Sequence, residues 1–364
     1  MANANINKKF KIMYDVIIIG GGLSGLTTAY QLQKHDITVK VLEAQSRLGG
    51  RIETIFGQNQ TPMEMGATWF GKEHRNLYGL LSELSIPFFE QHTEGIALFE
   101  TLSFEPPQQY FVPSNTHSAF RVQGGTAQII TALQHKIGLE NIVLNCKITQ
   151  IEEQIDSLKI SDSALHTYIS KKIILALPPK LAENTIVFSP KLPNALSEIM
   201  QHTQTWMSGS VKFSVEYKTA FWLDNNFSGN VFSQTGLASE IYDHSHCELG
   251  KFALKGFLNG SALHYSKAER QAKVIAQLTH YFGNAAQEYL SYNDKIWNDA
   301  YIDVDGPFLP AHHNNGCPEY AKSYFNDKLF FAGTETSQVF GGYMDGAIIA
   351  ANAAAKRVLA SIKK

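Results

Sequence analysis

A glycine-rich run near the N-terminus constrains the fold of this chain more than any other feature. Residues 20–25 read GGGLSG and fit the pattern G-x-G-x-x-G. They follow the apolar, β-branched run 14–20 and open the segment 23–35, whose apolar residues have helical spacing. A second apolar run, 37–43, completes a strand–helix–strand unit. Apolar runs without alternation are typical of strands buried on both faces, so the pattern predicts an α/β fold around a parallel sheet.

The same glycines predict a dinucleotide site. Gly20 allows a tight turn, Gly22 lets the backbone approach a pyrophosphate, and Gly25 lets the helix pack closely on the strand. The start of the helix then offers unpaired N–H groups to an anion. Glu43 ends the second strand, 18 residues after Gly25, where a carboxylate can accept both hydroxyls of an adenosine ribose.

Composition bounds the class of protein. The chain has 364 residues, enough for about two domains. Its formal net charge of −2 argues against nucleic acid and a charged membrane surface as partners. The apolar stretches are too short for a membrane anchor, and the first nine residues lack the apolar core of a secretory signal. Cys146, Cys247 and Cys317 are odd in number and widely spaced, which favours a reducing, cytoplasmic location.

Three further segments carry a family resemblance. Arg47 to Arg51 read R-x-G-G-R, residues 64–69 read EMGATW, and residues 333–347 read GTETSQVFGGYMDGA. Together with the glycine motif, these segments resemble the flavin-containing amine oxidase family over roughly residues 14 to 360. The resemblance implies FAD as the cofactor. The position of the covalent flavin cysteine of some members is Gly306 here, so non-covalent binding is expected.

The resemblance also implies a domain organisation and a set of cofactor contacts. The overall class is α/β (α+β overall), with a Rossmann-type FAD-binding domain and a smaller substrate domain containing an antiparallel sheet and helices. The expected ranges are 13–83, 120–195 and 298–364 for FAD binding, 84–119 and 196–297 for the substrate domain, and 1–12 for a flexible tail. The FAD positions implied by the motifs are Gly20, Gly22, Leu23, Ser24, Gly25, Glu43, Ala44, Arg47, Gly49, Gly50, Arg51, Gly66, Ala67, Thr68, Trp69, Ile148, Gly333, Glu335, Gly342, Tyr343 and Met344.

Catalytic candidates follow from the same resemblance. Lys212 lies in an alternating run, 209–217, that predicts an antiparallel strand buried on one face. The resemblance places Lys212 beside flavin N5, where it assists reaction with O₂, and places Trp297 near the flavin. Tyr343 matches one aromatic wall at the substrate. The other wall falls at Pro307, so Phe308 fills this role only if its loop shifts.

The function predicted from these residues is an FAD-dependent amine oxidase. A carbon next to nitrogen would deliver a hydride to the flavin, and O₂ would reoxidise it to give hydrogen peroxide. A desaturase or isomerase on the same fold remains an alternative because the second aromatic wall is missing. A flavin-binding interaction protein and an NAD-dependent dehydrogenase are further alternatives. The sequence leaves the particular amine and the oligomeric state open.

A histidine-rich loop offers metal-ligand residue types without a convincing site. Asp243, His244, His246 and Cys247 lie in one short loop, and ligands at such spacing do not by themselves make a metal centre. We therefore expect no metal. The segment between residues 70 and 120 is also shorter than the resemblance leads one to expect, which indicates a reduced covering over the substrate cavity.

Overall fold

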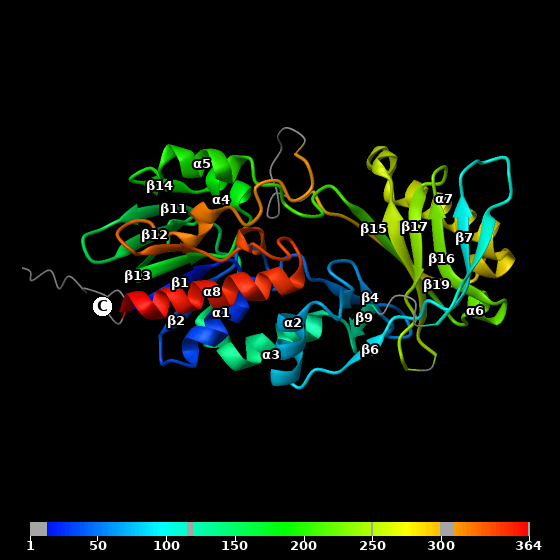
Figure 1. Ribbon diagram of the computed structural model, residues 1–364, viewed down its shortest axis with the longest axis horizontal. Helices are drawn as coiled ribbons and strands as arrows, with labels where there is room; N and C mark the ends of the chain where they lie inside the picture. Colours follow the sequence, from blue (N-terminus) through cyan, green and yellow to red (C-terminus); the bar gives the residue numbers. More distant parts are fainter. Residues whose placement is uncertain (1–12, 115–118, 249, 299–308, 363–364) are drawn as a thin grey trace, which may run out of the picture.

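The computed structural model describes residues 13–114, 119–248, 250–298 and 309–362. It shows two lobes along the long axis of the molecule (Figure 1). One lobe surrounds β1 (Met13–Ile19), and the other surrounds β15 (Val211–Tyr217). A large cavity lies where segments of the two lobes meet.

The first lobe contains the predicted strand–helix–strand unit. β1 pairs in parallel with β2 (Val39–Leu42) on one side and with β13 (Thr167–Leu175) on the other. The strand order is β10-β2-β1-β13-β12-β11-β14, and β20 pairs with the end of β13. The remaining strands are β10 (Ile142–Val143), β11 (Ile148–Glu153), β12 (Leu158–Asp162), β14 (Val187–Ser189) and β20 (Leu329–Phe331).

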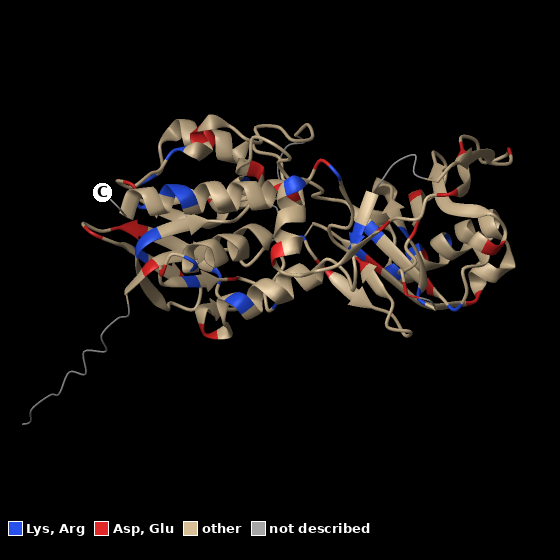
Figure 2. Cartoon of the chain, turned by 60° about the horizontal axis from the view of Figure 1, so that its bottom comes forward, with Lys and Arg blue, Asp and Glu red and all other residues tan. Residues whose placement is uncertain are grey.

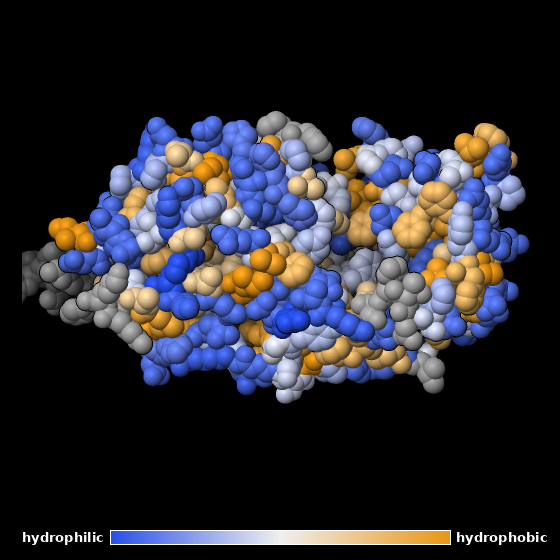
Figure 3. Space-filling view, in the orientation of Figure 1, coloured by the Kyte–Doolittle hydropathy of each residue, from blue (hydrophilic) through white to orange (hydrophobic). Residues whose placement is uncertain are grey.

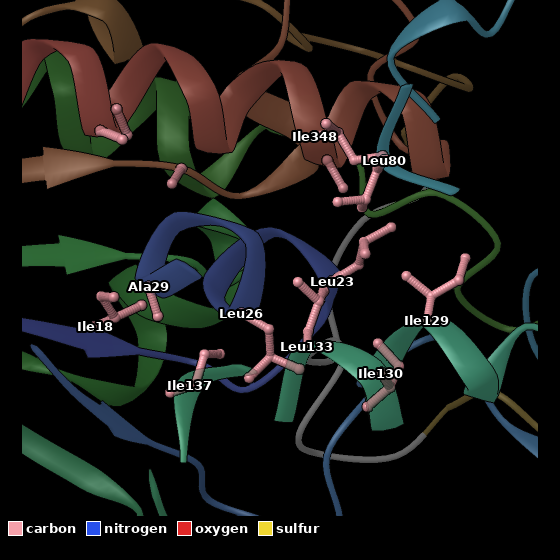
Figure 4. Close-up of a cluster of buried hydrophobic side chains, with 14 of the residues drawn as sticks. Ile18, Leu23, Leu26, Ala29, Leu80, Ile129, Ile130, Leu133, Ile137 and Ile348 are labelled. Carbon is pink, nitrogen blue, oxygen red and sulfur yellow. The ribbon is translucent and has the colours of Figure 1, made fainter. Parts of the chain in front are cut away.

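Helices cover this sheet through apolar stripes. One cluster joins α1 (Leu23–Gln33), α2 (Arg75–Glu83), α3 (Ala127–Ile137) and α8 (Met344–Ile362) to the sheet, as the side chains in Figure 4 show. Leu26 and Ala29 of α1 are fully buried in it. A second cluster packs α4 (Pro179–Thr185) and α5 (Asn194–Gln201) on the sheet.

The second lobe is a largely antiparallel sheet. Its strand order is β19-β15-β18-β17-β16-β7-β8, with β16 and β7 parallel. The helix α7 (Lys267–Phe282) packs on it through residues such as Val274 and Leu278, and a capping box of Ser266 and Glu269 starts that helix. The other elements are β7 (Gly95–Glu100), β8 (Gln108–Val112), β16 (Phe227–Ser233), β17 (Ala238–Asp243), β18 (Phe252–Leu258), β19 (Tyr289–Ile296) and the short helix α6 (Phe221–Asp224).

One expectation about β15 is wrong. All seven of its residues are buried, although alternation predicted a half-buried strand. The strand lies between β18 and β19, and its apolar residues, such as Phe213, join the core under α7. Its alternate polar residues, such as Lys212 and Glu216, contact the first lobe. The alternation of apolar and polar residues in β15 therefore reflects two buried environments, the apolar core under α7 and the polar contact with the first lobe.

Small sheets and turns complete the chain. β3 (Thr54–Phe56) pairs with β4 (Pro62–Glu64), and β9 (Ala119–Val122) pairs with β5 (Phe70–Gly71) and β6 (Phe88–Glu90). Short 3₁₀ turns lie at Leu139–Asn141, Gly260–His264, Asn284–Gln287, Pro318–Ala321 and Thr334–Thr336.

The boundary expected at residue 195 falls inside α5. Leu196 and Met200 of this helix are buried in a cluster of the first sheet, so all of α5 packs with the first lobe. The tail 1–12 and Phe308 lie outside the described residues.

The surface carries both signs of charge. Figure 2 shows basic and acidic residues intermixed on both lobes. In Figure 3, hydrophilic residues cover much of the visible face, with apolar residues in small groups between them. Among the described helices, none is both long and apolar enough to span a membrane.

Candidate active site

A long cavity begins at the carboxyl ends of β1 and β2 and runs to the second sheet. This is the edge where open α/β sheets bind ligands. Both lobes contribute lining residues. They include Gly20, Gly22, Leu23, Ser24, Glu43, Ala44, Gln45, Gly49, Gly50, Arg51, Gly66, Ala67, Thr68, Trp69, His74, Cys146, Lys147, Ile148, Trp206, Met207, Lys212, Phe257, Trp297, Gly333, Thr334, Gly342, Tyr343, Met344 and Asp345.

Glu43 marks one end of this cavity. Its carboxylate accepts the N–H of Gly21 at 2.6 Å and the N–H of Gln45 at 2.8 Å. Burial raises the pKa of Glu43, while these backbone donors oppose the rise. Ile148 lines the same cavity, as the resemblance implies for the adenine end. This end can therefore receive an adenosine.

The glycine loop leaves the start of α1 open to a ligand. Gly22 forms a bridge with Gly49, and no side chain caps the helix start. The first turn also contains no acidic residue, so its N–H groups favour an anion. Gly25 has a packing role instead, because an added Cβ would lie 1.9 Å from the carbonyl oxygen of Gly20. A phosphate-bearing cofactor fits this cradle.

Of the arginines in the described part of the chain, Arg51 lines the cavity and the others do not. Its guanidinium forms a bidentate pair with Glu335, at 2.6 and 3.0 Å. Glu335 is fully buried and does not line the cavity, so it orients Arg51. Arg47 donates to the carbonyls of Gly50 and Ile52 and therefore supports the loop from behind.

The other end of the cavity brings Lys212 and Trp297 close together. Lys212 Nζ donates to the carbonyl of Gly66 at 2.7 Å, and Trp297 Nε1 donates to the carbonyl of Met65, also at 2.7 Å. Burial lowers the pKa of Lys212 to about 8, while the charge of Glu64 opposes this shift. Tyr343, the third catalytic candidate, lines the same cavity, and 40% of its surface is exposed.

The last helix also begins at this end. Met344 opens α8, one residue earlier than the pattern predicted. Asp345 in its first turn accepts the backbone N–H of Leu77 at 2.7 Å and a side-chain N–H of Asn76 at 3.0 Å. Its carboxylate therefore supports α2, while the helix start remains at the cavity wall.

Three aromatic lining residues, Phe70, Trp206 and Phe257, were missed from the sequence. Trp206 lies 5.6 Å from Tyr343 between ring centroids, and the imidazole of His312 stacks on Trp206 at 4.1 Å. Gly342 permits this arrangement, since an added Cβ would lie 2.5 Å from Cβ of Trp206. Phe70 on β5 and Phe257 on β18 also line the cavity. Neither Trp206 nor Phe257 lies in a recognisable motif, so the sequence alone did not predict their place in the cavity wall.

The histidine-rich loop contacts buried charges behind the cavity. Nδ1 of His244 lies 2.7 Å from the guanidinium of Arg121, and its Nε2 accepts the N–H of Glu64 at 3.2 Å. Burial and neighbouring cations hold the pKa of His244 well below its usual value. Within the described residues, no group of three or more His, Cys, Asp or Glu side chains is arranged to hold a metal.

The fold and this cavity define a class of protein, the dinucleotide-dependent oxidoreductases. A model of the family of flavin containing amine oxidoreductases matches residues 23–105 and 88–359. The chain belongs to this family. It is therefore an FAD-dependent oxidoreductase that acts on amines, and the desaturase, isomerase, NAD-dependent and binding-only alternatives are not favoured.

Individual relatives are similar over nearly the whole chain. A probable flavin-containing monoamine oxidase A of Dictyostelium discoideum is 26% identical, with 92% of this chain and 95% of the relative covered. Among solved structures, a putrescine oxidase bound to putrescine has a TM-score of 0.83 at 20% identity, covering 96% of this chain and 99% of the other. A cyclohexylamine oxidase from Brevibacterium oxydans has a TM-score of 0.85 at 18% identity, covering 97% and 100%.

Proposed function

We propose that this protein oxidises monoamines with an apolar substituent, binds FAD non-covalently and passes electrons to O₂. One observation carries the choice of substrate. The cavity that Lys212 enters is also lined by the aromatic residues Trp206, Phe257, Trp297 and Tyr343, and Lys212 Nζ lies 4.9 Å from the centroid of the Phe257 ring. Aromatic faces attract an amine and also accept an apolar group.

The described carboxylates that line the cavity are not free to bind a second amino group at this end. Glu43 lies at the opposite end, and Asp345, at the start of α8, already accepts N–H groups of Asn76 and Leu77. A second amino group of a polyamine would need a free negative partner, and neither of these carboxylates supplies one near Lys212. This supports monoamines over polyamines.

FAD supplies the redox chemistry when it is bound, accepting a hydride equivalent from the carbon next to nitrogen. The residues of the chain bind the cofactor, orient the amine and exclude water from the site. The start of α1 and Arg51 would hold the phosphates, and Glu43 would hold the ribose. Gly66 to Trp69, Gly342 and Met344 would flank the ring system. Tyr343 and Trp206 would orient the amine.

Lys212 supports O₂ as the electron acceptor. Its amine is enclosed on the cavity wall, where a cation would stabilise negative charge that develops on O₂. We further infer a cytoplasmic location, because Cys146, Cys247 and Cys317 are all unpaired and stay reduced there.

The test uses the purified protein. We expect a yellow protein that releases FAD into the supernatant after acid precipitation. Anaerobic mixing should bleach the flavin with cyclohexylamine or benzylamine and leave it oxidised with putrescine. Air should then restore the colour and produce hydrogen peroxide. Bleaching by putrescine alone would overturn the substrate class, and a flavin that stays with the precipitate would overturn non-covalent binding.

A further inference from the structure

Two lysines lie on the same buried face of the second sheet. β15 and β18 are antiparallel neighbours in which Lys212 is opposite Phe257 and Ser214 is opposite Lys255. Opposite residues, and residues two apart on a strand, share a face of the sheet. Lys255 therefore points with Lys212 toward the first lobe, and it has no exposed surface.

Both lysines end on the segment Gly66–Trp69 beside the cavity. Lys212 Nζ donates to the carbonyl of Gly66, and Lys255 Nζ donates to the hydroxyl of Thr68. The same hydroxyl donates to the Gly66 carbonyl at 3.1 Å. Lys255 Nζ also lies 4.7 Å from the centroid of the Trp69 ring. The two amines therefore hold one short segment of the cavity wall.

The segment Gly66–Trp69 is packed closely on the side away from the two lysines. An added Cβ at Gly66 would lie 2.1 Å from the carbonyl oxygen of Arg51, so this backbone is packed from behind. Trp69 is fixed as well. Its Nε1 donates to Gln91 at 3.0 Å, and its ring meets the edge of Tyr242 at 5.0 Å. Lys255 is thus one of the contacts that hold Thr68 and Trp69 in place.

The enclosed amine of Lys255 has a neutral partner. Its Nζ donates to the hydroxyl of Thr68, and among the described residues it forms no ion pair with a carboxylate. Glu216, the buried carboxylate on the same face of β15 as Lys212, already accepts the N–H groups of Gln58 and Asn59. Glu64 is therefore the buried carboxylate whose charge acts on both lysines. An unpaired charge is costly inside a protein, so one of the two lysines releases its proton.

Lys255 is the lysine placed to release it. It is completely enclosed, whereas Lys212 lines the cavity. Burial lowers the pKa of Lys255 well below its usual value. The charges of Lys212 and Arg121 lower it further, and Glu64 opposes them.

We propose that Lys255 is a positioning residue that acts as an uncharged amine, holding Thr68 and Trp69 in place and leaving the Glu64 carboxylate to Lys212. The charge of Lys255 does not depend on the proposed function. Its effect on the reaction of Lys212 with O₂ does rest on that function.

Equilibrium unfolding of the FAD-bound protein tests the charge of Lys255. An amine that is uncharged in the folded protein and charged in the unfolded chain makes the protein more stable as the pH rises. We expect the unfolding constant of K255M, divided by that of the wild type, to increase with pH, by up to about tenfold per pH unit below the pKa of an unfolded lysine. The exposed Lys218 gives the control K218M, whose ratio should stay flat. A flat ratio for K255M would show that Lys255 is charged when folded and would overturn the proposal. If K255M does not fold, K255Q retains a hydrogen-bond donor and should give the same slope.

Flavin reoxidation in the variants tests the effect on Lys212. K255R introduces a permanent cation, so the pH midpoint of reoxidation should fall by about one unit, whereas K255M should leave it in place. A higher midpoint in K255M with an unchanged midpoint in K255R would contradict the assignment. Absence of any pH dependence in the wild type would instead count against the proposed role of Lys212, and the unfolding comparison would still decide the charge of Lys255.

Discussion

At the scale of a residue, Lys212 gives the most direct test of the proposed reaction. Its amine lies on the cavity wall and donates to Gly66. Replacement by methionine keeps the volume but removes the charge. We expect K212M to reoxidise its flavin about 100-fold more slowly in air, while anaerobic reduction by amine changes little. Stopped-flow absorbance separates the two steps. Equal slowing of both would exclude a specific role with O₂, and K218M is the matched exposed-lysine control.

The titration of Lys212 gives a pH prediction with a definite sign. Burial lowers its pKa to about 8, so the side chain carries its charge below that pH and loses it above. Reoxidation by O₂ should therefore slow as the pH rises through about 8, and K212M should lose this step. The rate measured from pH 6 to 10 checks it. A rate that rises through pH 8 would be incompatible with a cation that assists O₂.

Individual site residues differed in how far the sequence could predict them. Glu43 and Lys212 lie within local patterns, and both line the cavity. Trp206 and Lys255 have no such pattern. The contact of Lys255 with Thr68 joins residues 187 positions apart, and Trp206 meets Tyr343 only because the chain folds back. Local sequence carries no direct signal for contacts of this kind.

At the scale of an element, the packing of α1 on β1 depends on the glycine at position 25. A Cβ there would lie 1.9 Å from the carbonyl oxygen of Gly20, so α1 must shift. We expect G25A to lower the free energy of unfolding by about 2 kcal/mol and to weaken FAD binding. In α2, G79A is the matched control, because its added Cβ meets nothing within 4 Å. It should raise stability by about 0.5 to 1 kcal/mol. Urea unfolding and FAD titration measure both. Unimpaired FAD binding in G25A would contradict this account of the motif.

Elements were predictable where local pattern and burial agree. The β1–α1–β2 unit and α8 lie close to their predicted ranges, because apolar periodicity there reflects one sheet face or one helix stripe. For β15 the alternation was real, but the polar face is covered by another lobe. Alternation of polar and apolar residues does not show whether the polar face of a strand meets solvent or a buried polar interface.

At the scale of the whole molecule, Glu216 ties the two lobes together. From β15 its carboxylate accepts the backbone N–H groups of Gln58 and Asn59 in the β3–β4 turn, at 2.6 and 3.0 Å. We expect E216Q to lower the free energy of unfolding by about 2 kcal/mol, because a neutral amide satisfies fewer of these donors. The exposed Glu288 provides the control E288Q. Urea unfolding, with limited proteolysis of the turn, measures the effect. Equal stability of the two variants would show that the lobes do not depend on this contact.

The distribution of the cavity along the chain has a consequence for biosynthesis. The lining begins at Ile19 and ends at Ala347 in α8, so the walls of the cofactor site are not complete until nearly the whole chain has been made. The cavity therefore closes only when α8 packs beside the N-terminal unit. A chain truncated before Met344 should lack this wall and fail to retain FAD.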